Sequence, residues 1–218
     1  AKHINEKFLP DKAIDVIDEA GAVDRLKPPE LRTGKVTVTE VEGIVAKMAR
    51  IPPKTVQASE KQQLQDLERE LKAVIFGQNA AIDEMGSAIK LTRSGLRSPE
   101  KPIGSFLFLG PTGVGKTETA KALSAIFFGD EKYMLRLDMS EYQGEDSLSK
   151  LTGDFKTGKS GVLSDMMRDK PYGVLLLDEF EKTSKEVLNL FLQILDEGFF
   201  SDMAGKKVNA RNLIIIAT

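Results

Sequence analysis

The chain has 218 residues, 41% of them hydrophobic, and its 31 basic and 33 acidic side chains leave a net charge of -2. This composition is typical of a globular protein with one sizeable core, and it disfavours binding to nucleic acid or an anionic membrane through bulk charge. The absence of cysteine excludes a disulfide framework, and no apolar run is long enough to span a membrane, so we expect a cytoplasmic protein.

The N-terminal part of the chain, residues 1–50, is predicted to form a small, mostly helical unit. Pro10 suits the first turn of a helix. A short β-type run over residues 36–38 precedes a second helix, whose start we assign to a capping box of Thr39 and Glu42. The unit is too small to hold much core alone, so we expect it to pack on something else. The start of the chain resembles neither a signal peptide nor an initiator methionine, and we expect it to lie inside a longer protein.

Two further helices are predicted, over residues 59–72 and 79–95, with an apolar turn between them. The turn contains Ile75 and Phe76. An apolar turn ahead of a sheet suits a flat aromatic base, so both residues are candidates for the wall of an adenine pocket. Ordinary core packing is an equally good interpretation of these two residues.

A phosphate-binding loop is predicted at residues 110–117, whose sequence GPTGVGKT matches the pattern G-x-x-x-x-G-K-[ST] at every defined position. The apolar run before it, residues 105–109, is typical of a buried strand, and residues 118–126 are typical of a helix. The N–H groups at the start of a helix are unpaired and carry partial positive charge, and glycines let the backbone direct them at one anion. The alternative, a chance glycine-rich turn, does not account for the strand and helix on either side.

Residues 111–118 are predicted to bind ATP. Lys116 reaches the β- and γ-phosphates, and the Thr117 hydroxyl holds Mg²⁺. The remaining nucleotide-binding positions predicted here are Pro111, Thr112, Gly113, Val114, Gly115 and Glu118.

The rest of the chain alternates strands with helices. Strands are predicted over residues 133–138, 172–177 and 213–217, and a helix over 184–195; residues 143–161 are predicted as a loop with one short helix, and 199–211 as turns. This alternation predicts an α/β fold, in which helices sandwich a parallel sheet.

Two adjacent carboxylates, Asp178 and Glu179, follow the most apolar of these strands. In phosphate-loop ATPases an acid at such a strand end holds Mg²⁺, so Asp178 is predicted as a metal ligand. Glu179 is predicted as the catalytic residue that takes a proton from the attacking water or polarises it. A strand that simply ends in solvent is the alternative, and the complete phosphate loop upstream argues against it.

Other candidates have simpler interpretations. His3 is most simply a solvent-exposed residue, and Met166 and Met167 most simply fill gaps in the core. Asp138 and Glu141 follow a strand, where a structural or capping role is at least as good an explanation as nucleotide binding, so they are not included in the predicted site.

Five motifs occur in an order that closely resembles the Clp family of two-ring AAA+ unfoldases, the ClpA, ClpB and ClpC type. They are LPDKAID at residues 9–15, IFGQ at 75–78, the phosphate loop, LDMSEY at 137–142 and LLLDE at 175–179. The resemblance covers almost the whole chain. It implies an AAA+ phosphate-loop fold in which residues 1–50 are the small helical subdomain of a preceding module, 51–72 a linker helix, and 73–218 most of the second module's large subdomain.

The resemblance also implies functional roles. Ile75 and Phe76 match the adenine-contacting turn of the family, and Lys116, Thr117, Asp178 and Glu179 match its phosphate, magnesium and hydrolysis residues. The family forms hexamers that use ATP and Mg²⁺ to pull unfolded or tagged proteins through a central pore. Some members deliver the substrate to a ClpP-like protease, and others rescue aggregates.

The chain departs from the family pattern in two ways. The usual pore loop with glycine, tyrosine, valine and glycine is replaced by the shorter DFKTGKSG at residues 154–161, where Phe155 is the only aromatic residue. The family's sensor and arginine-finger residues lie beyond Thr218. An arginine finger accelerates phosphoryl transfer by about 10³–10⁵, so we expect the chain by itself to hydrolyse ATP poorly.

Three functional hypotheses follow from the sequence. The first is an ATPase that drives protein unfolding, supported by Asp178 and Glu179. The second is a module in which the nucleotide holds subunits of a hexamer together, supported by the altered pore loop. The third, a nucleic-acid motor, is opposed by the charge balance.

Overall fold

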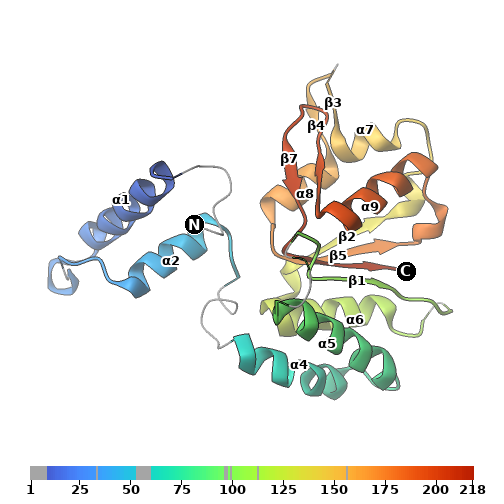
Figure 1. The fold of residues 1–218 in the computed structure, drawn as a ribbon, viewed down its shortest axis with the longest axis horizontal. Coiled ribbons are helices and arrows are strands. Elements are labelled where there is room, and N and C mark those ends of the chain that lie inside the picture. The colour runs from blue at the N-terminus through green and yellow to red at the C-terminus, as the bar shows by residue number, and fades with distance from the viewer. Residues whose placement is uncertain are drawn as a thin grey trace. The chain divides into compact units, whose positions relative to one another are not determined.

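The computed structural model describes residues 9–32, 34–52, 60–95, 98, 100–111, 113–155 and 157–218. The chain divides into two units, residues 1–57 and 58–218 (Figure 1). No helix among the described residues is long and apolar enough to cross a membrane.

The first unit is a pair of helices, as predicted. α1 (Asp11–Leu26) packs on α2 (Val38–Met48), with the short turn η1 (Pro29–Leu31) between them. The buried side chains are Val16, Ala20 and Ile44, and Val23, Val41 and Val45 pack around them. This core is small because each helix contributes only a narrow apolar stripe.

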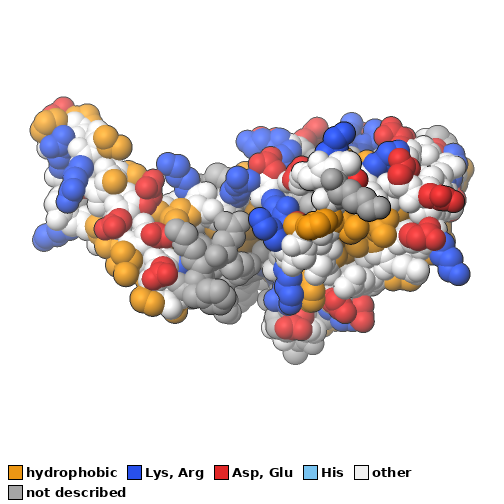
Figure 2. Space-filling model, turned by 90° about the horizontal axis from the view of Figure 1, so that it is seen from above, with side chains coloured by type: hydrophobic (Ala, Val, Ile, Leu, Met, Phe, Trp, Pro, Cys, Tyr) orange, Lys and Arg blue, Asp and Glu red, His pale blue; other side chains and the backbone are white. Residues whose placement is uncertain are grey.

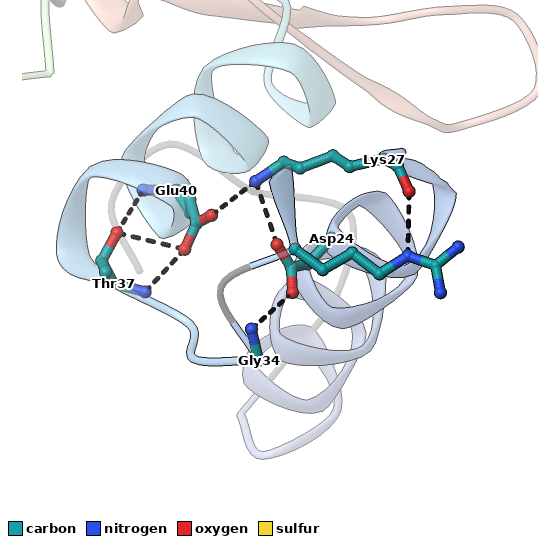
Figure 3. A network of polar contacts seen from close by, with 6 residues as sticks. Asp24, Lys27, Gly34, Thr37 and Glu40 are labelled. Atoms are coloured by element: carbon teal, nitrogen blue, oxygen red, sulfur yellow. Dashed lines mark hydrogen bonds and ion pairs between the residues drawn. The ribbon is translucent and has the colours of Figure 1, made fainter. Parts of the chain in front are cut away.

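The start of α2 corrects two sequence predictions (Figure 3). No β-strand forms over residues 36–38, and the capping box consists of Thr37 and Glu40 instead of Thr39 and Glu42. The Thr37 hydroxyl accepts from the Glu40 N–H at 3.4 Å, and the Glu40 carboxylate accepts from the Thr37 N–H at 2.9 Å. Because these two bonds satisfy N–H groups at the helix start, Val38 becomes the first helical residue.

A lysine supports the capping box that forms. Lys27 Nζ donates to Glu40 Oε1 at 2.9 Å and to Asp24 Oδ1 at 3.1 Å, which ties the end of α1 to the start of α2 (Figure 3). Asp24 also accepts from the Gly34 N–H at 2.9 Å. The hydrogen bond from Lys27 is the largest cause that lowers the pKa of Glu40, and the same bond raises the pKa of Lys27.

The second unit is built on a four-stranded parallel sheet. The strands are β1 (Gly104–Leu107), β2 (Met134–Asp138), β5 (Gly173–Asp178) and β8 (Leu213–Ala217), in the order β1-β8-β5-β2. β5 and β8 are central, and residues 173–177 and 213–216 are buried, as expected for strands covered on both faces.

Helices cover both faces of this sheet, so the predicted sandwich is confirmed (Figure 1). One layer contains α4 (Glu60–Val74), α5 (Asn79–Arg93) and α6 (Lys116–Leu123), and α6 continues as a π-helical turn, η2 (Ser124–Phe128). The other layer contains α7 (Ser147–Thr152), α8 (Val162–Asp169) and α9 (Lys185–Glu197). The second layer packs on alternate residues of the central strands, such as Leu175 and Leu177. Met167 is buried in this core and Met166 packs against it, as predicted.

Two short hairpins and one helix were not predicted from the sequence. β3 (Gly153–Asp154) pairs with β4 (Lys159–Ser160), and β6 (Phe199–Ser201) pairs with β7 (Lys207–Asn209). The missed helix is α8. Strands of two or three residues are too short to show alternation, so turns were all that the pattern predicted. The short turns η3 (Glu131–Tyr133), η4 (Met139–Glu141) and η5 (Phe180–Lys182) complete the fold.

A buried carboxylate holds the turn between β6 and β7. Asp202 Oδ1 accepts from the N–H groups of Ala204 and Lys206 at 3.0 and 2.8 Å, and Oδ2 pairs with Arg168 of α8. Burial raises the pKa of Asp202, but the hydrogen bonds from Arg168 and Lys206 outweigh it, and the net pKa is lowered. A lowered pKa stabilises the fold above the unfolded-state value of about 3.9, and that stabilisation is lost as the pH falls through the folded-state pKa.

We therefore expect Asp202→Asn to destabilise the chain most at neutral pH. Denaturant unfolding at pH 7 and at about pH 3 measures the free energy of unfolding of the variant and the wild type. The difference between these two free energies should be smaller at the acidic pH. The control is Glu145→Gln, at an exposed position in the loop before α7. Its free energy of unfolding should equal that of the wild type at both pH values. A difference between Asp202→Asn and the wild type that stays constant with pH would contradict this role.

Candidate active site

A hollow of about 810 Å³ lies at the carboxyl ends of the parallel strands. Its walls come from the loop after β1, the first turn of α6, Arg136 in β2, and the ends of β5 and β8. Ligands of parallel α/β sheets bind at this edge, because the loops that follow the strands converge there. The lining includes two cationic side chains, Lys116 and Arg136, and four acidic ones, Glu118, Asp178, Glu179 and Glu181.

The glycine-rich loop forms one wall of the hollow. Gly113 and Gly115 have φ angles of 87° and 94°, in the left-handed region that residues with a Cβ rarely adopt. Gly115 is the N-cap of α6, so the N–H groups of the helix start lie next to the loop. Lys116 Nζ donates to the Gly110 carbonyl at 2.6 Å, which holds the ammonium across the loop.

Most of the predicted nucleotide-binding residues lie on or beside this wall. Pro111, Gly113, Gly115, Lys116, Thr117 and Glu118 line the hollow, and Thr112 lies outside the described residues. Val114 lines a second, neighbouring hollow of about 300 Å³, together with apolar residues of α5 and β1 such as Ile82 and Leu107.

The sequence reasoning missed Gln78, which supports the loop from behind. Gln78 Nε2 donates to the Val114 carbonyl at 3.1 Å and joins the start of α5 to the glycine-rich loop. The preceding residues behave differently: Ile75 is 6% exposed and Phe76 is 83% exposed, and neither is among the residues that line the two hollows. Their assignment to an adenine pocket stays a prediction.

The acidic turn after β5 forms the opposite wall. Both carboxylate oxygens of Asp178 have partners: Oδ1 accepts from the Thr218 hydroxyl at 2.7 Å, and Oδ2 accepts from Arg136 Nη2 at 2.7 Å. Thr218 follows β8 and Arg136 lies on β2, so both strands that pair with β5 contribute one donor. Neither residue was predicted from the sequence.

Glu179 is held in an unusual backbone conformation. Its φ and ψ are 56° and 43°, in the left-handed region, which costs roughly 1–3 kcal/mol for a residue other than glycine. The next N–H, that of Phe180, donates to the Thr218 carbonyl at 3.0 Å and fixes the turn. Glu179 Oε2 pairs with Lys182 Nζ at 2.7 Å, and this bond is the main reason that the pKa of Lys182 is raised.

Asp138 has the capping role considered for it. Its carboxylate accepts from the Ser140 hydroxyl and N–H at 2.6 and 3.0 Å and caps η4. The hydroxyl bond is the largest cause that lowers the pKa of Asp138, and the charge of Arg136 contributes. Asp138 and Glu141 are not among the residues that line the hollow.

The donors in the hollow fit a magnesium ion only if a ligand shares it. The described residues contain no cluster of three or more acidic, histidine or cysteine side chains that could hold a metal alone. Thr117 and Asp178 line the hollow and offer one hydroxyl and one carboxylate. Mg²⁺ is commonly bound by one or two protein oxygens together with phosphate oxygens and water, so this donor set suits Mg²⁺ bound with a phosphate chain.

Comparisons with known proteins show the family of this chain. A family model described as "AAA domain (Cdc48 subfamily)" matches residues 101–218, and one described as "AAA lid domain" matches residues 1–76. A ClpA homolog protein of Fuscovulum blasticum is 48% identical over the whole chain, and the negative regulator of genetic competence ClpC/MecB of Bacillus subtilis is 35% identical, also over the whole chain. The chain spans 28% and 34% of the length of these two relatives.

A solved structure has the same fold. A closed-state cryo-EM reconstruction of Hsp104 with ATPγS and FITC-casein superposes with a TM-score of 0.79 at 37% sequence identity. The match covers 97% of this chain and 37% of the Hsp104 chain. Both the small helical unit and the sheet unit therefore lie within the region that is similar.

Proposed function

The chain belongs to the AAA domain family (Cdc48 subfamily) of ATPases, and we propose that it binds ATP with Mg²⁺ in the larger hollow and hydrolyses it. The observation that carries this proposal is that the glycine-rich loop and the acidic turn, about 60 residues apart in the sequence, line one hollow. The chemistry needs both parts: donors that hold a phosphate chain, and a base that activates water.

The proposed mechanism assigns one task to each side chain. Lys116 moves its ammonium from the Gly110 carbonyl to the phosphates, and the N–H groups at the start of α6 hold them. Thr117 and Asp178 hold the metal, which when bound neutralises charge on the phosphate oxygens. Glu179 takes a proton from water as the water oxygen bonds to the γ-phosphorus, and the bond between that phosphorus and the oxygen bridging to the β-phosphate breaks.

Lys116→Met tests nucleotide binding. A charge-assisted hydrogen bond contributes about 1.5–3 kcal/mol, so we expect ATP affinity to fall roughly tenfold to a hundredfold. Titration of a fluorescent ATP analogue measures this, with Lys121→Met as the control, because Lys121 lies on the same helix but outside the lining of the hollow. If the Lys116→Met variant and the wild type bind ATP with equal affinity, the phosphate loop is not part of the nucleotide-binding site.

For the whole protein we propose an ATP-driven hexameric machine that unfolds or remodels proteins, located in the cytoplasm. The similarity to ClpA, ClpC and Hsp104 supports this, and a ClpP-like protease is a candidate partner. We propose the same division of the chain as the sequence suggested, with residues 1–50 as the end of a preceding module. A nucleic-acid motor has less support, since acidic and basic side chains are interspersed on the face seen in Figure 2.

A second candidate function, nucleotide-dependent assembly without substrate gripping, rests on the β3–β4 hairpin. The hairpin is short and lacks the tyrosine expected of the family, although Phe155 at its turn is 80% exposed and could contact a substrate. Protein unfolding by a Phe155→Ala variant separates the two functions. Loss of unfolding with retained ATP turnover supports gripping, and unchanged unfolding supports the assembly module.

A further inference from the structure

We propose that Arg136 is a positioning residue that serves as the counterion of Asp178 and releases this carboxylate to Mg²⁺ when the metal–nucleotide complex binds. The inference rests on the proposed function, because it concerns the same hollow.

The contacts and burial of Asp178 favour such an exchange. Arg136 Nη2 and the Thr218 hydroxyl each bond one carboxylate oxygen at 2.7 Å. The Asp178 side chain is only 19% exposed, so little of it is open to a further ligand. Each oxygen keeps a second lone pair, but with so little of the side chain exposed, a metal reaches this carboxylate most readily by taking the place of one of the two donors.

Arg136 is the donor that can leave. The Thr218 backbone is fixed at two points, because its N–H donates to the Leu177 carbonyl at 2.9 Å and its carbonyl accepts from the Phe180 N–H at 3.0 Å. The Arg136 side chain is 54% exposed, and its guanidinium lies at the end of a long flexible stem. Ion pairs with an exposed partner contribute only about 0–1 kcal/mol, which a divalent cation can outcompete.

The charge around the hollow explains why a counterion is needed. Of the four acidic side chains that line it, Glu118 pairs with Lys121 and Glu179 pairs with Lys182. Asp178 pairs with Arg136, and without this partner its charge would repel a phosphate chain. Arg136 compensates the negative charge of Asp178 when no metal is bound, and Mg²⁺ compensates it when the metal–nucleotide complex is bound. Arg136 should therefore matter more for binding of the nucleotide alone than for binding of the metal–nucleotide complex.

The test compares the affinity of the full protein for ADP in EDTA and in saturating Mg²⁺. For Arg136→Gln we expect the ADP affinity to fall about three- to tenfold in EDTA and to change less than twofold in Mg²⁺. The factor by which Mg²⁺ increases ADP affinity should therefore be larger than in the wild type. Arg136→Lys keeps the charge and should recover most of the affinity in EDTA. Lys132→Gln, which removes an exposed charge just before β2 and outside the hollow's lining, should match the wild type in both conditions.

A double-mutant cycle sharpens the result. In an Asp178→Asn background, Arg136→Gln should no longer change the enhancement by Mg²⁺, because the pair is already broken. If Arg136→Gln lowers both affinities by the same factor, or if its effect persists in the Asp178→Asn background, Arg136 acts directly on the nucleotide and the inference is wrong. If the wild type binds no ADP in either condition, the proposed function itself fails.

Discussion

Replacing Glu179 with glutamine is expected to lower ATP turnover about 10²–10⁴-fold while ATP affinity changes little. The substitution keeps the size of the side chain but removes its ability to take a proton. Glu179 is presented by a left-handed turn fixed through the Thr218 carbonyl, so the glutamine side chain should occupy the same place. Steady-state turnover and nucleotide titration of the full protein, with and without an unfolded protein substrate, measure both quantities.

The matched control is Glu186→Gln, in the first turn of α9 and outside the lining of the hollow, for which turnover should be unchanged. The result also separates the candidate functions. A large loss with retained binding identifies this module as a motor and Glu179 as its catalytic carboxylate. Unchanged turnover and unfolding would instead mean that hydrolysis takes place elsewhere in the protein and that this module serves assembly.

Substituting alanine for Gly173 is expected to destabilise the sheet unit by roughly 3 kcal/mol or more. A Cβ at Gly173 would lie 2.0 Å from the carbonyl oxygen of Tyr133, which immediately precedes β2. Backbone cannot rotate away as a side chain can, so β2 and β5 must separate at this end. β5 carries Asp178 and β2 carries Arg136, and we therefore expect nucleotide binding to weaken together with stability.

Denaturant unfolding measures the change in the free energy of unfolding. Gly43→Ala is the control, because a Cβ at this position in α2 meets no atom within 4 Å. There the added methyl group should be neutral or stabilising by up to about 1 kcal/mol, since glycine is unfavourable inside a helix. Wild-type stability of the Gly173→Ala variant would show that the two strands can adjust at no cost.

The parts of the site that were predictable from the sequence are those with a local pattern. The glycine-rich loop and the acids after β5 each occupy a few consecutive residues, and the apolar runs of β5 and β8 identified the central strands. Arg136 and Thr218 have no such pattern. They reach Asp178 from 42 and 40 residues away in the sequence, through a strand register that only the folded sheet determines.

The capping box of α2 shows a different limit. Thr37 with Glu40 and Thr39 with Glu42 both match the pattern of threonine followed three residues later by glutamate. Local sequence cannot choose between them. The box that forms is the one whose glutamate also pairs with Lys27, from the end of the preceding helix.

The order of the strands also determines the size of the site. β8 lies between β1 and β5, so the phosphate loop and the acidic turn stand two strand spacings apart, about 10 Å. Main-chain hydrogen bonds set this separation, so exchanging a side chain alters the chemistry without altering the width. The strand spacing thus sets a minimum length for a molecule that contacts both walls. Such a molecule must reach from Lys116 to Glu179 and pass over Thr218, at the end of the middle strand.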